Sequence, residues 1–486
     1  MAAGLGTRMR SRQAKLLHPL TGLPLIRYPL RAVSALDADP VVVVIGHQAD
    51  EMMAACGEHS VRFAHQSQQH GTGHAAQCAA EVLTDFTGDV LILYGDLPLL
   101  TSEALASLVA AHRGAGAVLS LLTATIDDAH GFGRIIREHG RVVGIVEERD
   151  ANAAQRAIRE VNVGVYCVAS SFLFPALKRL RSNNAQGELY LTDIVGQAAA
   201  QGSVIADAPV AEAEVAQVNS RVELANVERA LRQRITHRWM TDGVTLDDPD
   251  TTYIGPDVMI GHDTVIGPNV ILRGSTQIGD ACRIDGSDLI VDSVIDNAVH
   301  VKFGVVITES HIGAGCQIGP FAQLRPGTHL AANVHIGDFV ETKNAVIGSG
   351  TKANHLAYIG DAEIGRDSNV GAGAITCNYD GVRKHRTVIG ARVQIGSDSQ
   401  LIAPVTIGDD AYIATGTTVM QDVPAGALAF TVKRQEHRPG WVATRHARET
   451  KAGPATPAKK TKSTTKRRAV PKLRARTAAA KKRRSR

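Results

Sequence analysis

Aromatic residues and cysteines are scarce in this sequence. Phe, Trp and Tyr make up only 4% of the 486 residues, so the hydrophobic cores must consist mainly of aliphatic side chains. Without any CxxC pair, the cysteines suit neither a zinc site nor a disulfide framework, and we expect buried, reduced thiols. The six cysteines are Cys56, Cys78, Cys167, Cys282, Cys316 and Cys377.

Long hydrophobic runs are also missing. No uncharged stretch approaches the roughly 18 residues of a membrane span, and the N-terminus lacks the apolar segment of a signal peptide. We therefore expect a cytoplasmic protein with no membrane span. A hydrophobic content of 44% over 486 residues is enough for two or three domains with cores of their own.

Acidic residues are absent from the end of the chain. Residues 451–486 contain 15 of the 53 Lys and Arg and no Asp or Glu, whereas residues 1–450 carry 38 basic and 48 acidic residues, a net charge of −10. Such a composition cannot bury a core, so we predict a disordered basic tail over residues 450–486. Its charge suits non-specific contact with nucleic acid, but it has no aromatic residue or motif that would read bases.

An aliphatic residue recurs at nearly every sixth position between residues 254 and 419, often followed by Gly. A period of six is typical of a parallel β-helix, in which three short strands form one coil and the aliphatic side chains stack into a continuous core. One-residue slips interrupt the series. It runs through Ile254, Ile260, Ile266, Leu272, Ile278, Ile284, Ile290, Ile295, Val301, Ile307, Ile312, Ile318, Leu324, Leu330 and Ile336, and then Ile389, Ile395, Leu401, Ile407, Ile413 and Val419.

The first half of the sequence alternates between strand-like and helix-like segments. Residues 41–45, 90–93 and 161–168 are aliphatic runs suited to buried strands, which predicts an α/β domain with a doubly wound sheet. A helix is predicted over residues 221–239. We therefore divide the chain into an α/β domain (1–221), a linker helix (222–242), a β-helix domain (243–449) and the tail (450–486).

Glycine-rich segments of the α/β domain carry its chemistry. The opening Ala2-Ala3-Gly4-Leu5-Gly6-Thr7-Arg8 lets backbone amides approach phosphates. Lys15, Gln66 with Gly71-Thr72-Gly73, and Tyr94-Gly95-Asp96 follow. The combination resembles the sugar-1-phosphate nucleotidyltransferases, although Asp96 alone would suit a turn residue, and Arg8 and Lys15 alone a solvated face.

This resemblance implies a binding site for UTP and Mg²⁺. By resemblance, the metal is shared by Asp96 and Asn219, and the triphosphate is held by Arg8 and Lys15, which act as catalytic cations. The remaining nucleotide-site residues implied by the resemblance are Ala2, Ala3, Gly4, Gln66, Gly71, Thr72, Tyr94 and Gly95, of which Gln66, Gly71 and Thr72 would read uracil. Gly131-Phe132-Gly133-Arg134, Val146-Glu147 and Val161-Asn162-Val163-Gly164 resemble the sugar motifs of N-acetylglucosamine-specific members, so Gly133, Glu147 and Asn162 would bind the hexosamine.

The β-helix segment contains polar motifs that its repeat does not need, over residues 324–327, 339–343, 355–361 and 374–381. The repeat resembles the left-handed hexapeptide-repeat acyltransferases, which are typically trimers. Both halves together, over residues 2–441, resemble the family of bifunctional N-acetylglucosamine-1-phosphate uridylyltransferases and glucosamine-1-phosphate N-acetyltransferases. The resemblance implies a homotrimer that acetylates glucosamine-1-phosphate and then uridylylates the product to UDP-N-acetylglucosamine, a cell-envelope precursor.

The same resemblance assigns residues for the acetyl transfer. His355 would be the general base, since a histidine is largely neutral near cytosolic pH, and Glu341 would orient it. Arg325, Lys343 and Tyr358 would clamp the sugar phosphate, and Asn369 would position the sugar. Acetyl-CoA would contact Ala372, Asn378, Tyr379, Ser397, Thr415 and Val432, although Asn378 and Tyr379 could equally position the sugar.

The sequence departs from the family pattern at several places. Thr415 replaces a usual Ala, and Val432 a usual Arg, although Lys433 and Arg434 follow directly. Residues 378–385 interrupt the hexads, and we expect them to project as a loop toward a neighbouring subunit. Met1 stands at the last position of a strand that the family has ahead of its Gly-rich loop. We therefore expect the first strand of the domain to be missing, and we favour a start site further upstream over an inactive domain.

Two other functions remain open from the sequence. The solenoid of a sugar nucleotidyltransferase could serve only for oligomerisation, but it would then not need Arg325, Lys343, His355 and Tyr358. A scaffold protein tethered to nucleic acid by the basic tail would instead show DNA binding that salt weakens.

Overall fold

The computed structural model describes residues 1–451 except residues 5, 58 and 433. The predicted tail therefore lies outside the described residues from residue 452 onward. The described chain forms two compact units, residues 1–431 and the segment from Val432 onward, which contains helix α9 (Trp441–Lys451). In the described part, no helix is long and apolar enough to cross a membrane.

The α/β domain contains a six-stranded mixed sheet. Its order is β10-β6-β9-β7-β8, and β5 pairs with β9 beside β7. Only β10 and β6 run parallel; the other neighbours are antiparallel. The strands are β5 (Asp89–Ile92), β6 (Leu119–Thr125), β7 (Arg134–Glu138), β8 (Arg141–Val146), β9 (Glu160–Ala169) and β10 (Ile205–Pro209).

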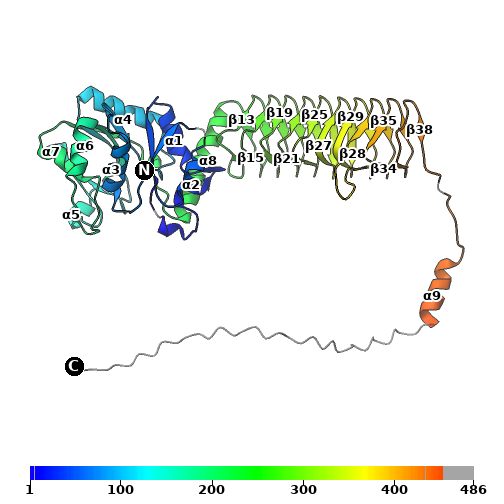
Figure 1. Ribbon diagram of the computed structural model, residues 1–486, viewed down its shortest axis with the longest axis horizontal. Helices are drawn as coiled ribbons and strands as arrows, with labels where there is room; N and C mark the ends of the chain where they lie inside the picture. Colours follow the sequence, from blue (N-terminus) through cyan, green and yellow to red (C-terminus); the bar gives the residue numbers. More distant parts are fainter. Residues whose placement is uncertain (5, 58, 433, 452–486) are drawn as a thin grey trace. The chain divides into compact units, whose positions relative to one another are not determined.

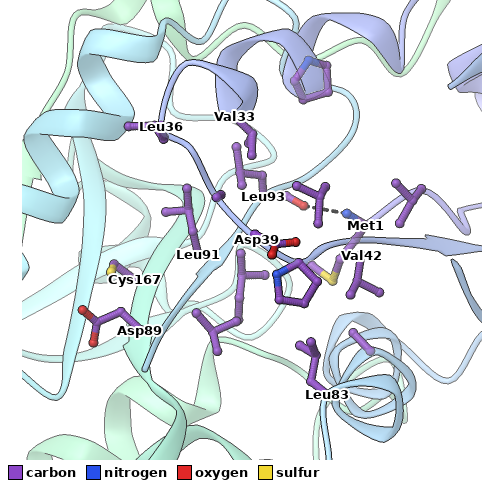
Figure 2. A pocket seen from close by; sticks show the side chains of 18 of the residues that line it. Met1, Val33, Leu36, Asp39, Val42, Leu83, Asp89, Leu91, Leu93 and Cys167 are labelled. Carbon is purple, nitrogen blue, oxygen red and sulfur yellow. Dashed lines mark hydrogen bonds between the residues drawn. The ribbon is translucent and has the colours of Figure 1, made fainter. Parts of the chain in front are cut away.

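A second, separate sheet holds only β3 (Val41–Ile45) and β4 (Val61–His65), which run parallel. The α/β class predicted from the sequence is confirmed, but its strands form two separate sheets where a doubly wound sheet was expected. Met1 and Ala2 connect β3 to the segment after β5 by backbone hydrogen bonds, one of which joins the Met1 amino group to the Leu93 carbonyl (Figure 2). The Ala2 N–H donates to the Val44 carbonyl at 2.8 Å, and the Gly95 N–H donates to the Met1 carbonyl at 3.0 Å. A short hairpin joins β1 (Pro19–Leu20) and β2 (Leu23–Pro24).

Helices cover both faces of these sheets (Figure 1). They are α1 (Arg27–Ser34), α2 (Ala49–Ala55), α3 (Thr72–Val82), α4 (Ser102–Ala115), α5 (Ala153–Arg156), α6 (Ser170–Lys178) and α7 (Asp193–Ala200), with short 3₁₀ turns η1 (Thr7–Met9), η2 (Lys15–Leu17) and η3 (Glu212–Glu214). The three strands expected from the aliphatic runs are confirmed as β3, β5 and β9.

Helix α8 (Arg221–Thr241) joins the α/β domain to the solenoid. It starts at a capping box: the Ser220 side chain accepts from the Glu223 N–H, and the Glu223 carboxylate accepts from the Ser220 N–H at 2.7 Å. Its Val227 and Leu231 pack into the core of the α/β domain, whereas its Trp239 belongs to the core of the solenoid. The helix thus contributes to both cores.

The solenoid is a parallel β-helix whose coils stack along its length (Figure 1). Its first face contains β11 (Thr245–Leu246), β14 (Val265–Ile266), β17 (Arg283–Ile284), β20 (His300–Val301), β23 (Gln317–Ile318), β26 (His335–Asp338), β28 (Lys352–His355), β30 (Asn369–Val370), β33 (Gln394–Ile395), β36 (Tyr412–Ile413) and β38 (Leu428–Ala429). The second face contains β12 (Tyr253–Ile254), β15 (Ile271–Arg273), β18 (Leu289–Val291), β21 (Val306–Thr308), β24 (Gln323–Leu324), β27 (Glu341–Ile347), β29 (Tyr358–Ile364), β31 (Ile375–Cys377), β34 (Gln400–Ile402) and β37 (Thr418–Val419).

The third face contains β13 (Met259–Ile260), β16 (Gln277–Ile278), β19 (Val294–Ile295), β22 (His311–Ile312), β25 (His329–Leu330), β32 (Thr387–Ile389) and β35 (Val405–Ile407), and the long strands β27 and β29 continue onto it. Every aliphatic residue of the predicted hexad series is buried in one continuous core. The slips in the series are coils one residue shorter: Ile254 pairs with Leu272, but Ile278 pairs with Ile295.

The six cysteines are all free thiols, and four of them are buried. Cys282 and Cys316 belong to the solenoid core.

Candidate active sites

A polar cluster lies where η2, the segment after β5 and the start of α8 meet. The Lys15 ammonium donates to Asp96 Oδ2 at 2.5 Å and to Asn219 Oδ1 at 3.0 Å. The Val218 N–H donates to the Asp96 carbonyl at 3.1 Å, and the Asn219 N–H donates to Glu223 Oε2 at 2.6 Å. These contacts bring together three predicted residues that lie far apart in the sequence.

The same cluster has the donor set of a magnesium site. Asp96 Oδ1 is buried and has no hydrogen-bond partner, while Asp96 Oδ2 and Asn219 Oδ1 both face the Lys15 ammonium. A buried carboxylate oxygen without a partner is costly unless a cation binds it. Carboxylate and amide oxygens are the ligands that Mg²⁺ prefers, so these residues fit the metal.

The Gly-rich loop contains a glycine in the left-handed region, which glycine adopts without strain. Ala2 and Ala3 are buried, Gly4 is exposed, and Gly6 has a left-handed φ of 58°. Arg8 lies in η1 and is exposed to solvent.

The residues expected to read the base form a second group at the start of α3. Gly71 precedes this helix with a φ of 102°, and a Cβ there would lie 2.6 Å from the Leu189 carbonyl oxygen, so only glycine fits. Gln66 is buried, and its amide donates to the Gly71 carbonyl at 3.1 Å and lies 3.1 Å from His74 Nδ1. Thr72 Oγ1 accepts from the Leu191 N–H at 3.0 Å.

Tyr94 connects this group to the residues expected to bind the sugar. Burial raises the pKa of the Tyr94 phenol, so it stays neutral. Its ring packs against Gly164, where a Cβ would lie 2.1 Å from Tyr94 Cε2. Gly95, the next residue, donates its N–H to the Met1 carbonyl.

The three residues expected to bind the hexosamine are adjacent. The Asn162 N–H donates to the Gly133 carbonyl at 2.9 Å, and a Cβ at Gly133 would lie 3.4 Å from Glu147 Oε2. Burial raises the pKa of the Glu147 carboxyl, which accepts from the Thr192 hydroxyl at 3.1 Å. The Asn162 side chain is already engaged within the protein, because Nδ2 donates to the Tyr166 hydroxyl and Oδ1 accepts from the Gly164 N–H.

On the second face of the solenoid, the predicted phosphate clamp is assembled from successive coils. The backbone N–H of Arg325 donates to the carbonyl of Thr342, which precedes Lys343. Tyr358 is the strand partner of Glu341 on the next coil. The neighbouring Lys384 ammonium is the main cause of a lowered pKa of Lys343, and the Arg325 charge adds to it. Three cations therefore repel one another here, which favours binding of an anion.

His355 ends β28 on the first face and is 67% exposed. Its Nδ1 lies 2.8 Å from Asp338 Oδ1. Glu341, which the sequence suggested as the orienting residue, instead binds Arg325 at 2.6 Å. The expectation for Glu341 is therefore wrong: it sits on the second face, whereas Asp338 shares the face and the register of His355.

Several residues expected to contact acetyl-CoA line one edge of the later coils. The Asp398 N–H donates to the Ala372 carbonyl at 2.7 Å, and the Gly416 N–H to the Ser397 carbonyl at 2.9 Å. Ala372, Ser397 and Thr415 therefore stack on three consecutive coils. Asn369 pairs with Lys352 on the first face, three positions before Ala372.

The interruption of the hexads over residues 378–385 is a loop that projects from the solenoid (Figure 1). The Asn378 amide Nδ2 donates to Asp361 Oδ2 at 2.5 Å and lies 3.4 Å from the Tyr358 hydroxyl. Tyr379 and Val382 are exposed, and the backbones of Tyr379 and Lys384 form an isolated antiparallel β-bridge. Val432 is exposed and belongs to the second unit, and Lys433 lies outside the described residues.

Three functional candidates were missed from the sequence. Asp338 could have been found from its position in the sequence. It lies one 17-residue coil before His355, and residues one coil apart are adjacent in the solenoid. Asp361 lies in the polar motif over residues 355–361, although its contact with Asn378 does not follow from the sequence. Lys384 had no signal, because its position depends on the path of the loop.

An α/β domain with a Gly-rich loop and a polar cluster, followed by a hexapeptide solenoid with a polar cluster of its own, defines a two-domain transferase. Residues 1–197 match the model of the MobA-like NTP transferase domain, and residues 309–343 and 386–421 match bacterial transferase hexapeptide repeats. The chain is 49% identical over 444 residues to the bifunctional protein GlmU of Pelobacter propionicus, covering 91% of this chain and 96% of that one. It is 48% identical over 456 residues to that of Sorangium cellulosum, covering 92% and 96%.

The chain belongs to the GlmU family of bifunctional transferases. It combines a nucleotidyltransferase with a hexapeptide-repeat acetyltransferase.

Proposed function

We propose that the chain acetylates glucosamine-1-phosphate with acetyl-CoA and then transfers uridylyl from UTP to the N-acetylglucosamine-1-phosphate, releasing pyrophosphate. The observation that carries this proposal is that one chain holds two separate polar clusters, one around Asp96 and one around His355. Because the clusters lie in separate domains, the intermediate would diffuse from one to the other.

For uridylyl transfer, the sugar phosphate oxygen attacks the α-phosphorus of UTP, and the bond to pyrophosphate breaks. Two polyanions must meet, so cations are more useful here than a strong base. Arg8 and Lys15 neutralise the triphosphate, and the amides of Ala2, Ala3 and Gly4 contact its oxygens. Asp96 and Asn219 would hold Mg²⁺, which would supply positive charge to the reacting phosphates.

Recognition of the two substrates uses the remaining residues of the α/β domain. Gln66, Gly71 and Thr72 bind uracil at the start of α3. Tyr94 and Gly95 lie between the residues that bind the base and those that bind the sugar. Gly133, Glu147 and Asn162 bind the N-acetylhexosamine. The support for this group is its connectivity, since Asn162 N–H donates to the Gly133 carbonyl and Gly133 lies against Glu147.

For acetyl transfer, the amine nitrogen attacks the thioester carbon, the C–S bond breaks, and CoA leaves as its thiol. His355 accepts the amine proton at Nε2, because Asp338 accepts only and therefore keeps the proton of the imidazole on Nδ1. Arg325, Lys343 and Tyr358 hold the sugar phosphate, and Asn369 positions the sugar. Ala372, Ser397, Thr415 and Val432 contact acetyl-CoA, with Asn378 and Tyr379 at the reacting end.

We infer that the protein acts as a homotrimer in the cytosol. An exposed apolar ladder follows one corner of the solenoid, from Phe303 through Phe321 and Phe339 to Leu356, with the rings of Phe321 and Phe339 stacked at 5.8 Å. Such a patch favours association with another copy. The six free thiols fit a reducing compartment, and the product would feed peptidoglycan and lipopolysaccharide precursors.

The experiment that tests the proposal measures the two reactions separately on the 486-residue chain. CoA release is followed with glucosamine-1-phosphate and acetyl-CoA, and pyrophosphate release with UTP, N-acetylglucosamine-1-phosphate and Mg²⁺. We expect both. Pyrophosphate release without CoA release would mean that the solenoid only assembles the protein, and a His355→Ala variant with full acetyl transfer would exclude His355 as the base.

A further inference from the structure

Gln66 is held in place by both its backbone and its side chain. It follows β4 directly, and its N–H donates to the Ile45 carbonyl of β3 at 2.8 Å. The side chain is buried, and its amide Nε2 donates to the Gly71 carbonyl at 3.1 Å. Because a carbonyl oxygen only accepts, this contact tells which end of the amide is the nitrogen.

The second hydrogen of the same amide points at His74, in the first turn of α3. Gln66 Nε2 lies 3.1 Å from His74 Nδ1. An amide nitrogen can only donate, so His74 Nδ1 accepts and the imidazole carries its proton on Nε2. His74 Nε2 in turn lies 3.9 Å from the sulfur of Cys78, a weak acceptor one helical turn further along α3.

These two contacts decide what the Gln66 side chain can offer a ligand. Both amide hydrogens are engaged, so Oε1 is the atom that remains for a base, and it can only accept. Uracil has a proton on N3, whereas cytosine has a lone pair there. If the amide were reversed to suit cytosine, Oε1 would face the lone pairs of the Gly71 carbonyl and of His74 Nδ1.

We propose that His74 is a positioning residue for the choice of base: it fixes the Gln66 amide so that the site takes pyrimidine nucleotides with a proton on N3 and rejects cytosine nucleotides. The inference rests on the proposed function, in which Gln66 reads the base, and His74 acts through Gln66 and not by contact with the base. A site built to hydrogen-bond one group rejects a ligand that lacks this group, because polar atoms are then left unpaired.

The neighbouring His70 provides a matched control. Its ring centroid lies 5.1 Å from that of His74, but it is exposed and its Nε2 lies 2.8 Å from Gln68 Oε1. Replacing His70 by Ala therefore removes an adjacent imidazole and keeps the acceptor that faces Gln66.

The test compares UTP with CTP on the full chain. Calorimetry with Mg²⁺ and without sugar phosphate gives the Kd of each nucleotide, and pyrophosphate release with N-acetylglucosamine-1-phosphate gives KM and kcat. His74→Ala removes the acceptor, whereas His74→Asn places an amide oxygen where Nδ1 was.

We expect His74→Ala to lower the preference for UTP over CTP, measured as the ratio of their Kd values, by about tenfold, which is the effect of one hydrogen bond. The loss should lie in the Kd and KM for UTP more than in kcat, because the base is remote from the reacting phosphorus. His74→Asn should restore most of the preference, and His70→Ala should keep the natural ratio.

Three results would overturn the inference: equal binding of UTP and CTP by the natural chain, an unchanged ratio in His74→Ala, or an equal loss in His74→Ala and in either His74→Asn or His70→Ala. The last would mean that packing around α3, and not the acceptor, sets the ratio. A chain that prefers UTP through His74 but releases no pyrophosphate would contradict the proposed reaction and support this inference, because the binding measurement needs no turnover.

Discussion

His355 and Asp338 form a hydrogen-bonded pair across two coils of the solenoid, with 2.8 Å between Nδ1 and Oδ1. A carboxylate only accepts, so the imidazole keeps its proton on Nδ1 and presents Nε2 as the basic atom. The pair links one predicted catalytic residue to one that the sequence did not single out. It gives Asp338 a positioning role that can be measured.

Replacing Asp338 by Ala should lower kcat for acetyl transfer by about tenfold or more, because the imidazole loses the partner that fixes its tautomer. Asp338→Asn should retain more activity, since its amide oxygen still accepts from Nδ1. CoA release under saturating substrates measures kcat, and the KM values for both substrates should stay the same. Equal kcat values for both variants and the natural chain would show that the pair has no role in the reaction.

Replacing His355 by Ala should reduce acetyl transfer by about 10² to 10⁴, the usual contribution of a general base. Pyrophosphate release should be unchanged, because this reaction belongs to the other domain. His329→Ala is a matched control, since His329 lies on the third face of the same solenoid. A loss in both variants would point to damaged folding and not to a lost base.

Replacing Asp96 by Ala should reduce Mg²⁺-dependent pyrophosphate release by at least about 10², because the metal loses its carboxylate ligand. The acetyl transfer should remain. Asp85→Ala, which removes an exposed carboxylate of the same domain, serves as the control. Full pyrophosphate release by the Asp96 variant would exclude this residue as the metal ligand.

Replacing Gly164 by Ala should destabilise the α/β domain by more than about 2 kcal/mol. The new Cβ would collide with the Tyr94 ring, and Gly164 has a left-handed φ of 84°. Gly187→Ala is the control: its φ is 66° but nothing lies within 4 Å, so it isolates the backbone cost of about 1 kcal/mol. Urea unfolding measures both variants, and equal losses would mean that the contact with Tyr94 is unimportant.

The solenoid should lose stability as pH rises, because burial raises the pKa of Asp288 to about 7. The folded chain holds this proton more tightly than the unfolded chain, whose carboxyl titrates near 3.8. The stabilisation is therefore complete below about pH 3.8 and is lost as pH rises to about 7. Calorimetry at pH 5 and pH 8 should show a larger drop in the unfolding midpoint for the natural chain than for Asp288→Asn, and equal drops would contradict the assignment.

The solenoid was predictable almost residue by residue because its periodicity is local. Each aliphatic of the hexad series, from Ile254 to Val419, is buried, and the one-residue slips are the shorter coils. The split of the α/β sheet was not predictable in this way, since it depends on which edges pair across the interval between β3 and β5.

The sequence named several residues that the structure brings together, but it did not give their contacts. Lys15, Asp96 and Asn219 meet across 204 residues of sequence, a contact that only resemblance could suggest. Glu341 was assigned to the wrong partner because it lies on another face of the coil than His355. It binds Arg325, whereas Asp338 lies beside His355. Which side chains meet on each face of the solenoid depends on the alignment of successive coils. The spacing of residues along the chain does not give this alignment.

The stacking of Ala372, Ser397 and Thr415 makes the solenoid a molecular ruler. Adjacent strands of a sheet are about 4.8 Å apart whatever side chains they carry, so points on consecutive coils measure fixed steps along the axis. The length of an elongated molecule that contacts all three residues must match the distance between their coils along the axis. Its length can be matched by adding or removing whole coils, whereas the identity of each contact can change by single substitutions.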